Sequence, residues 1–124
     1  MAKRRTTGSK VEAFVEVAGY NVAFLRADRG DGEALAGIRL LAQQNGKGID
    51  VGSIAFFPDG AVLPPDQLRK FGDRDLIHMN LHVGRWADVL GVLRNERRIR
   101  LYFYGPSPDA GTADLRSLRE SFPT

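Results

Sequence analysis

The chain has 124 residues, of which 43% are hydrophobic and 27% charged, and its formal net charge at pH 7 is +3. This length is enough for one globular domain with a real core but too short for two. The absence of cysteine excludes disulfides, thiolate chemistry and cysteine metal sites, and it is typical of a protein of the reducing cytoplasm, the location we expect.

The positive charge is concentrated at the start of the chain, in Lys3, Arg4, Arg5 and Lys10. Subtracting these four charges from +3 leaves the remaining residues at −1, so we expect a basic tail and not a basic domain. Residues 1–9 are polar without periodicity and predict a disordered basic N-terminal arm, while 10–124 form a single globular domain. The arm is either a solvated terminus or a phosphate-contacting segment through these four residues.

No apolar run approaches the length of a membrane span, and two glutamates, Glu12 and Glu16, interrupt the first apolar segment. We therefore expect no signal peptide and no membrane partner.

The first half of the chain reads as short strands separated by turns. Residues 11–17 alternate with period two, Ala18-Gly19 predicts a tight turn, and 20–28 follow as a second strand, so a hairpin is expected. Residues 34–41 are apolar and fit a strand or a helix, with strand preferred. Residues 43–48 predict a turn, with Asn45-Gly46 as a common hairpin pair, before a strand over 49–57.

The stretch from Leu76 to Tyr104 carries the clearest pattern. Residues 76–83 alternate, with Ile77 and Met79 on one face and His78 and Asn80 on the other. A helix over 85–95 follows from its i, i+3, i+4, i+7 apolar stripe, listed as Trp86, Val89, Leu90 and Leu93. Residues 99–104 alternate again.

Several features of this stretch and its surroundings stay open. The helix either crosses over between parallel strands, which would be right-handed, or lies across the end of an antiparallel sheet. Residues 64–75 predict an irregular connector, with a turn of helix or none over 66–71. Residues 113–122 fit a strand or a helix.

Together these elements predict an α+β fold. We expect a mainly antiparallel sheet of about six strands, open or curled as far as a barrel, with one principal helix in a strand-helix-strand unit.

The two histidines, His78 and His82, lie four residues apart on a strand, about 13 Å at roughly 3.3 Å per residue, so one metal ion cannot bind both. We expect them to partner a neighbouring strand or solvent, with an acid/base role as the alternative. The acidic pairs, Asp28 with Asp31 and Asp73 with Asp75, lie in turns, where aspartate commonly caps its own backbone.

The common catalytic signatures are missing. The serines at 9, 53, 107, 117 and 121 have no sequence context that suggests an activated nucleophile. The glycine-containing turns match neither a dinucleotide-binding nor a P-loop motif. We therefore predict no catalytic residue, no metal and no cofactor, and we lean towards a protein that is not an enzyme.

The best candidate for a binding surface is an arginine- and tyrosine-bearing face made of Arg98, Arg100, Tyr102 and Tyr104. Three interpretations stay open: arginines paired with Glu12 or Glu16 on a neighbouring strand, a ligand or nucleic-acid face, and a contact between copies.

The function expected from the sequence is a small non-enzymatic binding or assembly module, and we expect a homo-oligomer. The first alternative is a nucleotide or single-stranded nucleic-acid binder that uses the arginine–tyrosine face and the basic arm. The second alternative is an enzyme whose site is built from loops.

Overall fold

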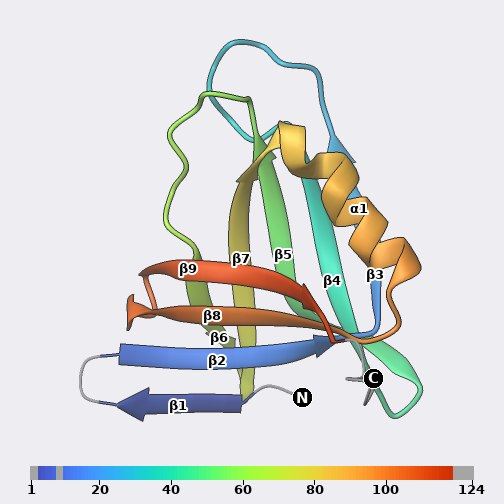
Figure 1. The fold of residues 1–124 in the computed structure, drawn as a ribbon, viewed down its shortest axis with the longest axis vertical. Helices are drawn as coiled ribbons and strands as arrows, with labels where there is room; N and C mark the ends of the chain where they lie inside the picture. Colours follow the sequence, from blue (N-terminus) through green and yellow to red (C-terminus); the bar gives the residue numbers. More distant parts are fainter. Residues whose placement is uncertain (1–2, 8–9, 119–124) are drawn as a thin grey trace, which may run out of the picture.

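The computed structural model describes residues 3–7 and 10–118, and in these ranges it has nine strands in two sheets and one α-helix (Figure 1). Sheet A has the order β1-β2-β8-β9, with bounds Lys3–Thr7, Lys10–Val17, Ile99–Ser107 and Ala110–Ser117. Sheet B has the order β3-β4-β5-β7-β6, with bounds Gly19–Leu25, Ala36–Gln44, Lys47–Phe57, Arg74–His82 and Gln67–Phe71. A 3-10 turn, η1 (Val83–Arg85), leads into α1 (Trp86–Asn95).

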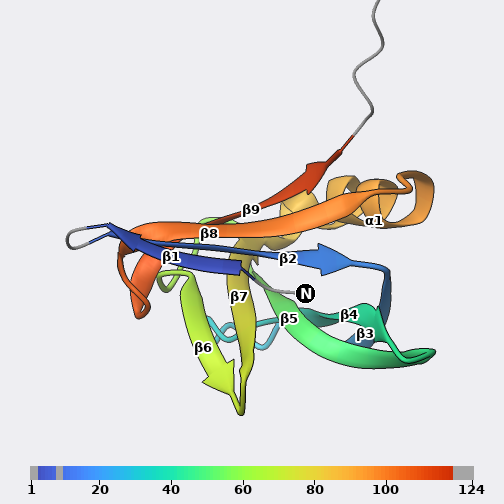
Figure 2. The same ribbon diagram turned by 90° about the horizontal axis from the view of Figure 1, so that it is seen from below.

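The two sheets pack face to face with their strands running across one another, and α1 lies beside sheet A on the same face of sheet B (Figures 1 and 2). The apolar side of each alternating strand points into this layer, where Phe56, Leu101 and Phe103 are almost completely buried. Trp86 at the start of α1 packs edge-on against Phe56, with ring centroids 4.9 Å apart. Sheet A and α1 leave the opposite face of sheet B uncovered.

The predicted fold class is confirmed: every strand pair is antiparallel except β5 with β7, and one α-helix follows β7 and precedes β8. The described chain has more strands than the six expected, and neither sheet closes on itself. The Asn45-Gly46 hairpin is confirmed, since both residues have positive φ (54° and 77°) and Gln44 pairs with Lys47. Strand is confirmed over residues 36–41, which lie in β4, and residues 113–117 are strand in β9, whereas 119–122 lie outside the described ranges.

The predicted hairpin of residues 11–17 with 20–28 is wrong. β2 belongs to sheet A and β3 to sheet B, and the chain changes sheets at Ala18, whose N–H donates to the carbonyl of Leu41. The strand-helix-strand unit likewise joins two sheets, so α1 is not a crossover within one sheet. The local pattern is correct in both cases, but an alternating strand does not specify which strand it pairs with.

Two further segments differ from expectation. The connector over 64–75 contains strand β6 and a turn into β7, with Gly72 at φ 62°. The arm expected to be disordered contains strand β1, which pairs antiparallel with β2; its remaining residues, 1–2 and 8–9, lie outside the described ranges. Backbone pairing with the free edge of β2 accounts for this strand, because it needs no apolar periodicity in the arm.

Candidate functional site

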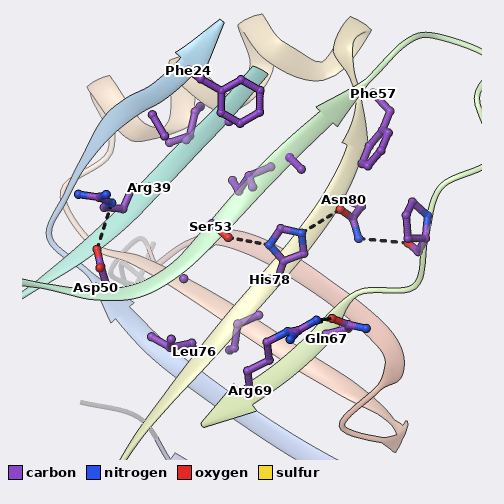
Figure 3. Close-up of a pocket in the computed structure, with 18 of the residues that line it drawn as sticks. Phe24, Arg39, Asp50, Ser53, Phe57, Gln67, Arg69, Leu76, His78 and Asn80 are labelled. Carbon is purple, nitrogen blue, oxygen red and sulfur yellow. Dashed lines mark hydrogen bonds and ion pairs between the residues drawn. The ribbon is translucent and has the colours of Figure 1, made fainter. Parts of the chain in front are cut away.

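The uncovered face of sheet B is hollowed into a pocket of about 550 Å³ (Figure 3). Its apolar walls include Phe24 from β3, Phe57 from β5 and Pro64 and Pro65 from the segment before β6. Volumes of 300–1,000 Å³ are usual for small-molecule sites. The pocket is therefore large enough for a small organic ligand.

A polar row crosses the floor of this pocket from strand to strand. Arg39 on β4 pairs in register with Ser53 on β5, Ser53 with His78 on β7, and His78 with Gln67 on β6. Directly opposed residues on neighbouring strands point to the same face of a sheet. Four strands thus contribute one polar side chain each to the same line.

Ser53 and His78 of this row form a hydrogen-bonded chain with Asn80, two residues beyond His78 on β7 (Figure 3). Ser53 Oγ lies 2.6 Å from His78 Nδ1, and His78 Nε2 lies 3.0 Å from Asn80 Oδ1. Asn80 Nδ2 donates to the carbonyls of Pro64 and Pro65, which leaves Asn80 Oδ1 as an acceptor. Nε2 of the neutral imidazole therefore carries the proton, and Ser53 donates its hydroxyl proton to Nδ1.

Burial keeps the imidazole neutral. It lowers the pKa of His78 below its ordinary value of 6.5, and the nearby positive charge of Arg69 lowers this pKa further. The hydrogen bond to Asn80 and the charge of Asp66 act in the opposite direction but do not outweigh burial. At pH 7 the ring is an acceptor at Nδ1.

Asn80 is itself held in place by Asp66. The carboxylate of Asp66 accepts the backbone N–H of Asn80 and that of Ala113, each at 2.7 Å, so it links β7 of one sheet to β9 of the other. Burial raises the pKa of Asp66 above its ordinary value, and the two backbone N–H donors partly offset this rise.

A β-bulge sets the other end of the pocket. Leu40 pairs with Gly52 but Leu41 pairs with Asp50, so Val51 is an extra residue in β5. The bulge turns Val51 into the core and Asp50 to the pocket face, where Asp50 Oδ1 lies 3.4 Å from Arg39 Nε.

The charge of the pocket lining is positive. It contains two guanidinium groups, Arg39 and Arg69, and one carboxylate, Asp50. The Arg69 guanidinium donates from Nε and from Nη2 to the neutral Gln67 Oε1. A positive lining on apolar walls suits a ligand that carries an anionic group.

The predicted candidates have different surroundings. His78 and His82 share the face expected from the alternation; His78 bonds to the neighbouring strand, and His82 Nε2 donates to the carbonyl of Ala61 at 2.7 Å. Asp28 and Asp31 accept N–H groups of their own loop, as expected. Within the described ranges, no group of three or more histidine, aspartate or glutamate side chains is arranged to hold a metal ion.

Asp75, predicted to lie in a turn with Asp73, is instead buried at the start of β7 and pairs with Lys70, with Nζ and Oδ1 3.8 Å apart.

The arginine–tyrosine face lies on the outer side of sheet A, away from the pocket. Arg100, Tyr102 and Tyr104 are on β8, whereas Arg98 is exposed just before the strand. Arg100 Nε donates to Glu16 at 2.8 Å, the pairing that one of the three interpretations expects. Its guanidinium also lies 4.4 Å from the centre of the Phe14 ring.

The two tyrosine rings of this face also have cations over them. Arg116 lies 4.5 Å from the centre of Tyr102, and Lys10 lies 5.5 Å from the centre of Tyr104. A base that stacked on these rings would compete with those cations. The remaining arm residues, Lys3, Arg4 and Arg5, are in β1 at the edge of the same sheet, and phosphate contact through them stays a prediction.

Sequence reasoning missed the pocket. Ser53 and Arg39 carry no sequence signal that links them to His78, because the link is made by strand pairing across 25 and 39 residues of sequence. The alternation of β7 did place His78 and Asn80 on one polar face, which is the only part of the site visible beforehand.

Comparisons with known proteins give no further guide: no family model, no curated protein and no solved structure matches this chain. In the described part of the chain, α1 is far too short and no other helix is long and apolar enough to cross a membrane.

Proposed function

We propose that this protein is a binding module that holds a small ligand in the sheet B pocket, and that the ligand combines an anionic group with an apolar body. The observation that carries the proposal is the pocket lining, in which Arg39, Arg69 and a neutral His78 face apolar walls. Binding of this kind requires no chemistry on the ligand, in keeping with the function expected from the sequence. A cytoplasmic location stays a prediction from the lack of cysteine.

Arg69 is the residue most suited to contact the anion. Its hydrogen bonds go to a neutral amide oxygen, so its charge is available to a carboxylate, sulfonate or phosphate, whereas Arg39 already has Asp50 beside it. Arg39 is at one end of the polar row, and Arg69 lies on β6 two residues beyond Gln67, which is at the other end. The ring of Phe24 and that of Phe57 offer apolar contact above the floor (Figure 3).

The anionic fluorophore 8-anilinonaphthalene-1-sulfonate is a suitable probe, because it joins a sulfonate to an apolar ring system. We expect it to bind the folded protein, and we expect Arg69→Gln to weaken binding about tenfold, since hydrogen bonds to charged groups contribute about 1.5–3 kcal/mol. Asp50→Asn should strengthen binding about two- to fivefold by releasing Arg39 from an exposed ion pair. Fluorescence titration measures all three affinities.

Arg98→Gln is the matched control, because it removes the same charge from an exposed site outside the pocket. Equal weakening by Arg69→Gln and Arg98→Gln would indicate binding by overall charge and contradict the proposal. Urea unfolding of each variant excludes probe binding to a loosened fold.

A second function, assembly of two copies of this chain, is favoured by the edge strand β3. Natural sheets protect their edges with charged residues. β3 has none in GYNVAFL, whereas the other three edge strands, β1, β6 and β9, all contain charged residues. Three large apolar side chains of β3, Val22, Phe24 and Leu25, are 44%, 43% and 67% exposed. We propose antiparallel pairing of β3 with β3 of a second copy.

Native mass spectrometry and sedimentation velocity test this assembly. We expect a dimer for the unmodified protein and a monomer for Val22→Lys, because a lysine at a paired edge opposes strand addition. Val62→Lys is the control: Val62 is 94% exposed in a loop, and its replacement should leave the dimer intact. A monomeric unmodified protein would contradict this second function.

A further inference from the structure

The hydrogen-bond directions around His78 match those needed to activate a hydroxyl group. A serine becomes a nucleophile when a neutral imidazole accepts its proton and a third group orients the ring. Ser53 donates to His78 Nδ1 over 2.6 Å, and Asn80, fixed by two proline carbonyls, accepts from Nε2. All three residues line the pocket.

We propose that Ser53 is a nucleophile for acyl transfer from carboxylic esters, with His78 as its general base and Asn80 as a positioning residue. This inference rests on the proposed function, because the pocket must admit the ester.

In the first step, Ser53 Oγ forms a bond to the carbonyl carbon of the ester while its proton moves to His78 Nδ1. The bond from that carbon to the alcohol oxygen then breaks, and the alcohol leaves with the proton from Nδ1; an acidic alcohol leaves as an anion, and Nδ1 then releases its proton to water. A water molecule next attacks the acyl-serine while His78 accepts its proton, and this proton passes to Ser53 Oγ as the carboxylic acid leaves. Each cycle consumes one ester and one water and needs no oxidant or cofactor.

The surroundings of Ser53 suit the charge that develops in this reaction. Arg39 is the register partner of Ser53 on β4, so its guanidinium, whose Nε lies 3.4 Å from Asp50, is on the same face of sheet B and would have to turn from Asp50 to donate to a negative carbonyl oxygen. Ser53 is part-buried and lies on a strand in the middle of sheet B, so neighbouring strands hold its backbone on both sides.

The first experiment uses p-nitrophenyl acetate as the ester. We expect release of p-nitrophenol and one acetyl group on Ser53, located by peptide mass spectrometry. Ser53→Ala should abolish the acetylation, and His78→Gln should slow it about 100-fold, as for loss of a general base. Acetylation of lysines only, or an equal rate in Ser53→Ala, would overturn the inference.

A second measurement uses the absence of cysteine from the chain. Ser53→Cys introduces a single thiol beside His78, and Ala55→Cys introduces one in the same pocket, two residues further along β5 and opposite Asn80. We expect iodoacetamide to modify the thiol of Ser53→Cys at pH 6 about tenfold faster than the thiol of Ala55→Cys. Proton transfer to the imidazole lowers the pKa of a thiol from about 8.5, so that more of it is thiolate.

The difference in alkylation rate between Ser53→Cys and Ala55→Cys should disappear when His78→Gln is added to Ser53→Cys. The other charged groups around the imidazole, Arg69 on β6, Asp66 before it, and Arg39 with Asp50 on the far side, are common to both thiol variants, so they do not account for a difference between them. Equal alkylation rates in folded Ser53→Cys and Ala55→Cys would show that His78 is no base for this position and would overturn the inference.

These results are separable from those that test ligand binding. If the unmodified protein binds the naphthalene sulfonate through Arg69 but shows no acetylation of Ser53, the proposed function stands and the acyl-transfer inference fails. If the naphthalene sulfonate does not bind at all, the proposed function fails, and the acyl-transfer inference loses the binding pocket on which it rests.

Discussion

The hydrogen bonds of its neighbours determine which tautomer the His78 side chain adopts. Asn80 donates both amide hydrogens to proline carbonyls, so its oxygen accepts from Nε2. Nδ1 then has no proton and accepts from the hydroxyl of Ser53. A charged imidazole could still bond to both neighbours, but it would lose its hydration through burial and lie near the positive charge of Arg69. Burial and the nearby positive charge of Arg69 hold His78 neutral, against the opposing effect of the hydrogen bond to Asn80.

Stability should therefore depend on pH through His78. Because its pKa is lower in the folded than in the unfolded protein, its contribution is complete above the ordinary value of 6.5 and is lost as pH falls from there through the folded pKa. We expect the free energy of unfolding, measured in urea, to decrease over this window. The decrease should be smaller in His78→Gln but preserved in His82→Gln, which retains His78. An unchanged pH dependence in His78→Gln would contradict the assignment.

Strand β5 is the element that shapes the site. Its bulge puts two consecutive residues, Val51 and Gly52, on the core side of sheet B, and Gly52 passes close to the backbone of β7. A Cβ at Gly52 would meet the carbonyl oxygen of Ile77 and, at 2.9 Å, the Cδ2 atom of Leu101. The neighbouring residue, Ser53, is brought opposite His78 by this close parallel pairing.

Two glycine replacements should thus have opposite effects. Gly52→Ala must push a strand away and should destabilise the protein by about 2 kcal/mol or more, as overpacking does. Gly91→Ala lies in α1 with open space around the added Cβ, and it should stabilise by about 0.5–1 kcal/mol through helix propensity. Chemical unfolding measures both values. A neutral Gly52→Ala would show that β5 and β7 separate at little cost.

Across the whole molecule, Asp66 is a polar link between the sheets within the apolar packing. Its two carboxylate oxygens accept buried N–H groups from Asn80 in sheet B and Ala113 in sheet A, and its own backbone exchanges hydrogen bonds with Gly111. The pocket floor and the packing of the two layers therefore share one side chain.

Asp66→Ala should destabilise the protein by about 3 kcal/mol, because two buried donors lose their acceptor at about 1–3 kcal/mol each. Asp59→Ala is the control: its carboxylate accepts one exposed N–H, that of Gly84, and its loss should cost less than about 1 kcal/mol. Equal effects in urea unfolding would show that the link is not important to the packing of the sheets.

The sequence by itself determined which residues face inward along β2, β7 and β8, the extent of α1 to within a residue, and the Asn45-Gly46 turn. These features depend on side-chain period and on φ, both of which are local. Only the tertiary structure decided that β2 and β3 belong to different sheets and that Ser53, His78 and Arg39 meet. Alternation with period two indicates which face of a strand a residue is on, but burial between segments far apart in the chain chooses the partner strand. A single bulge can also shift the alternation, so that the residues beyond it change faces.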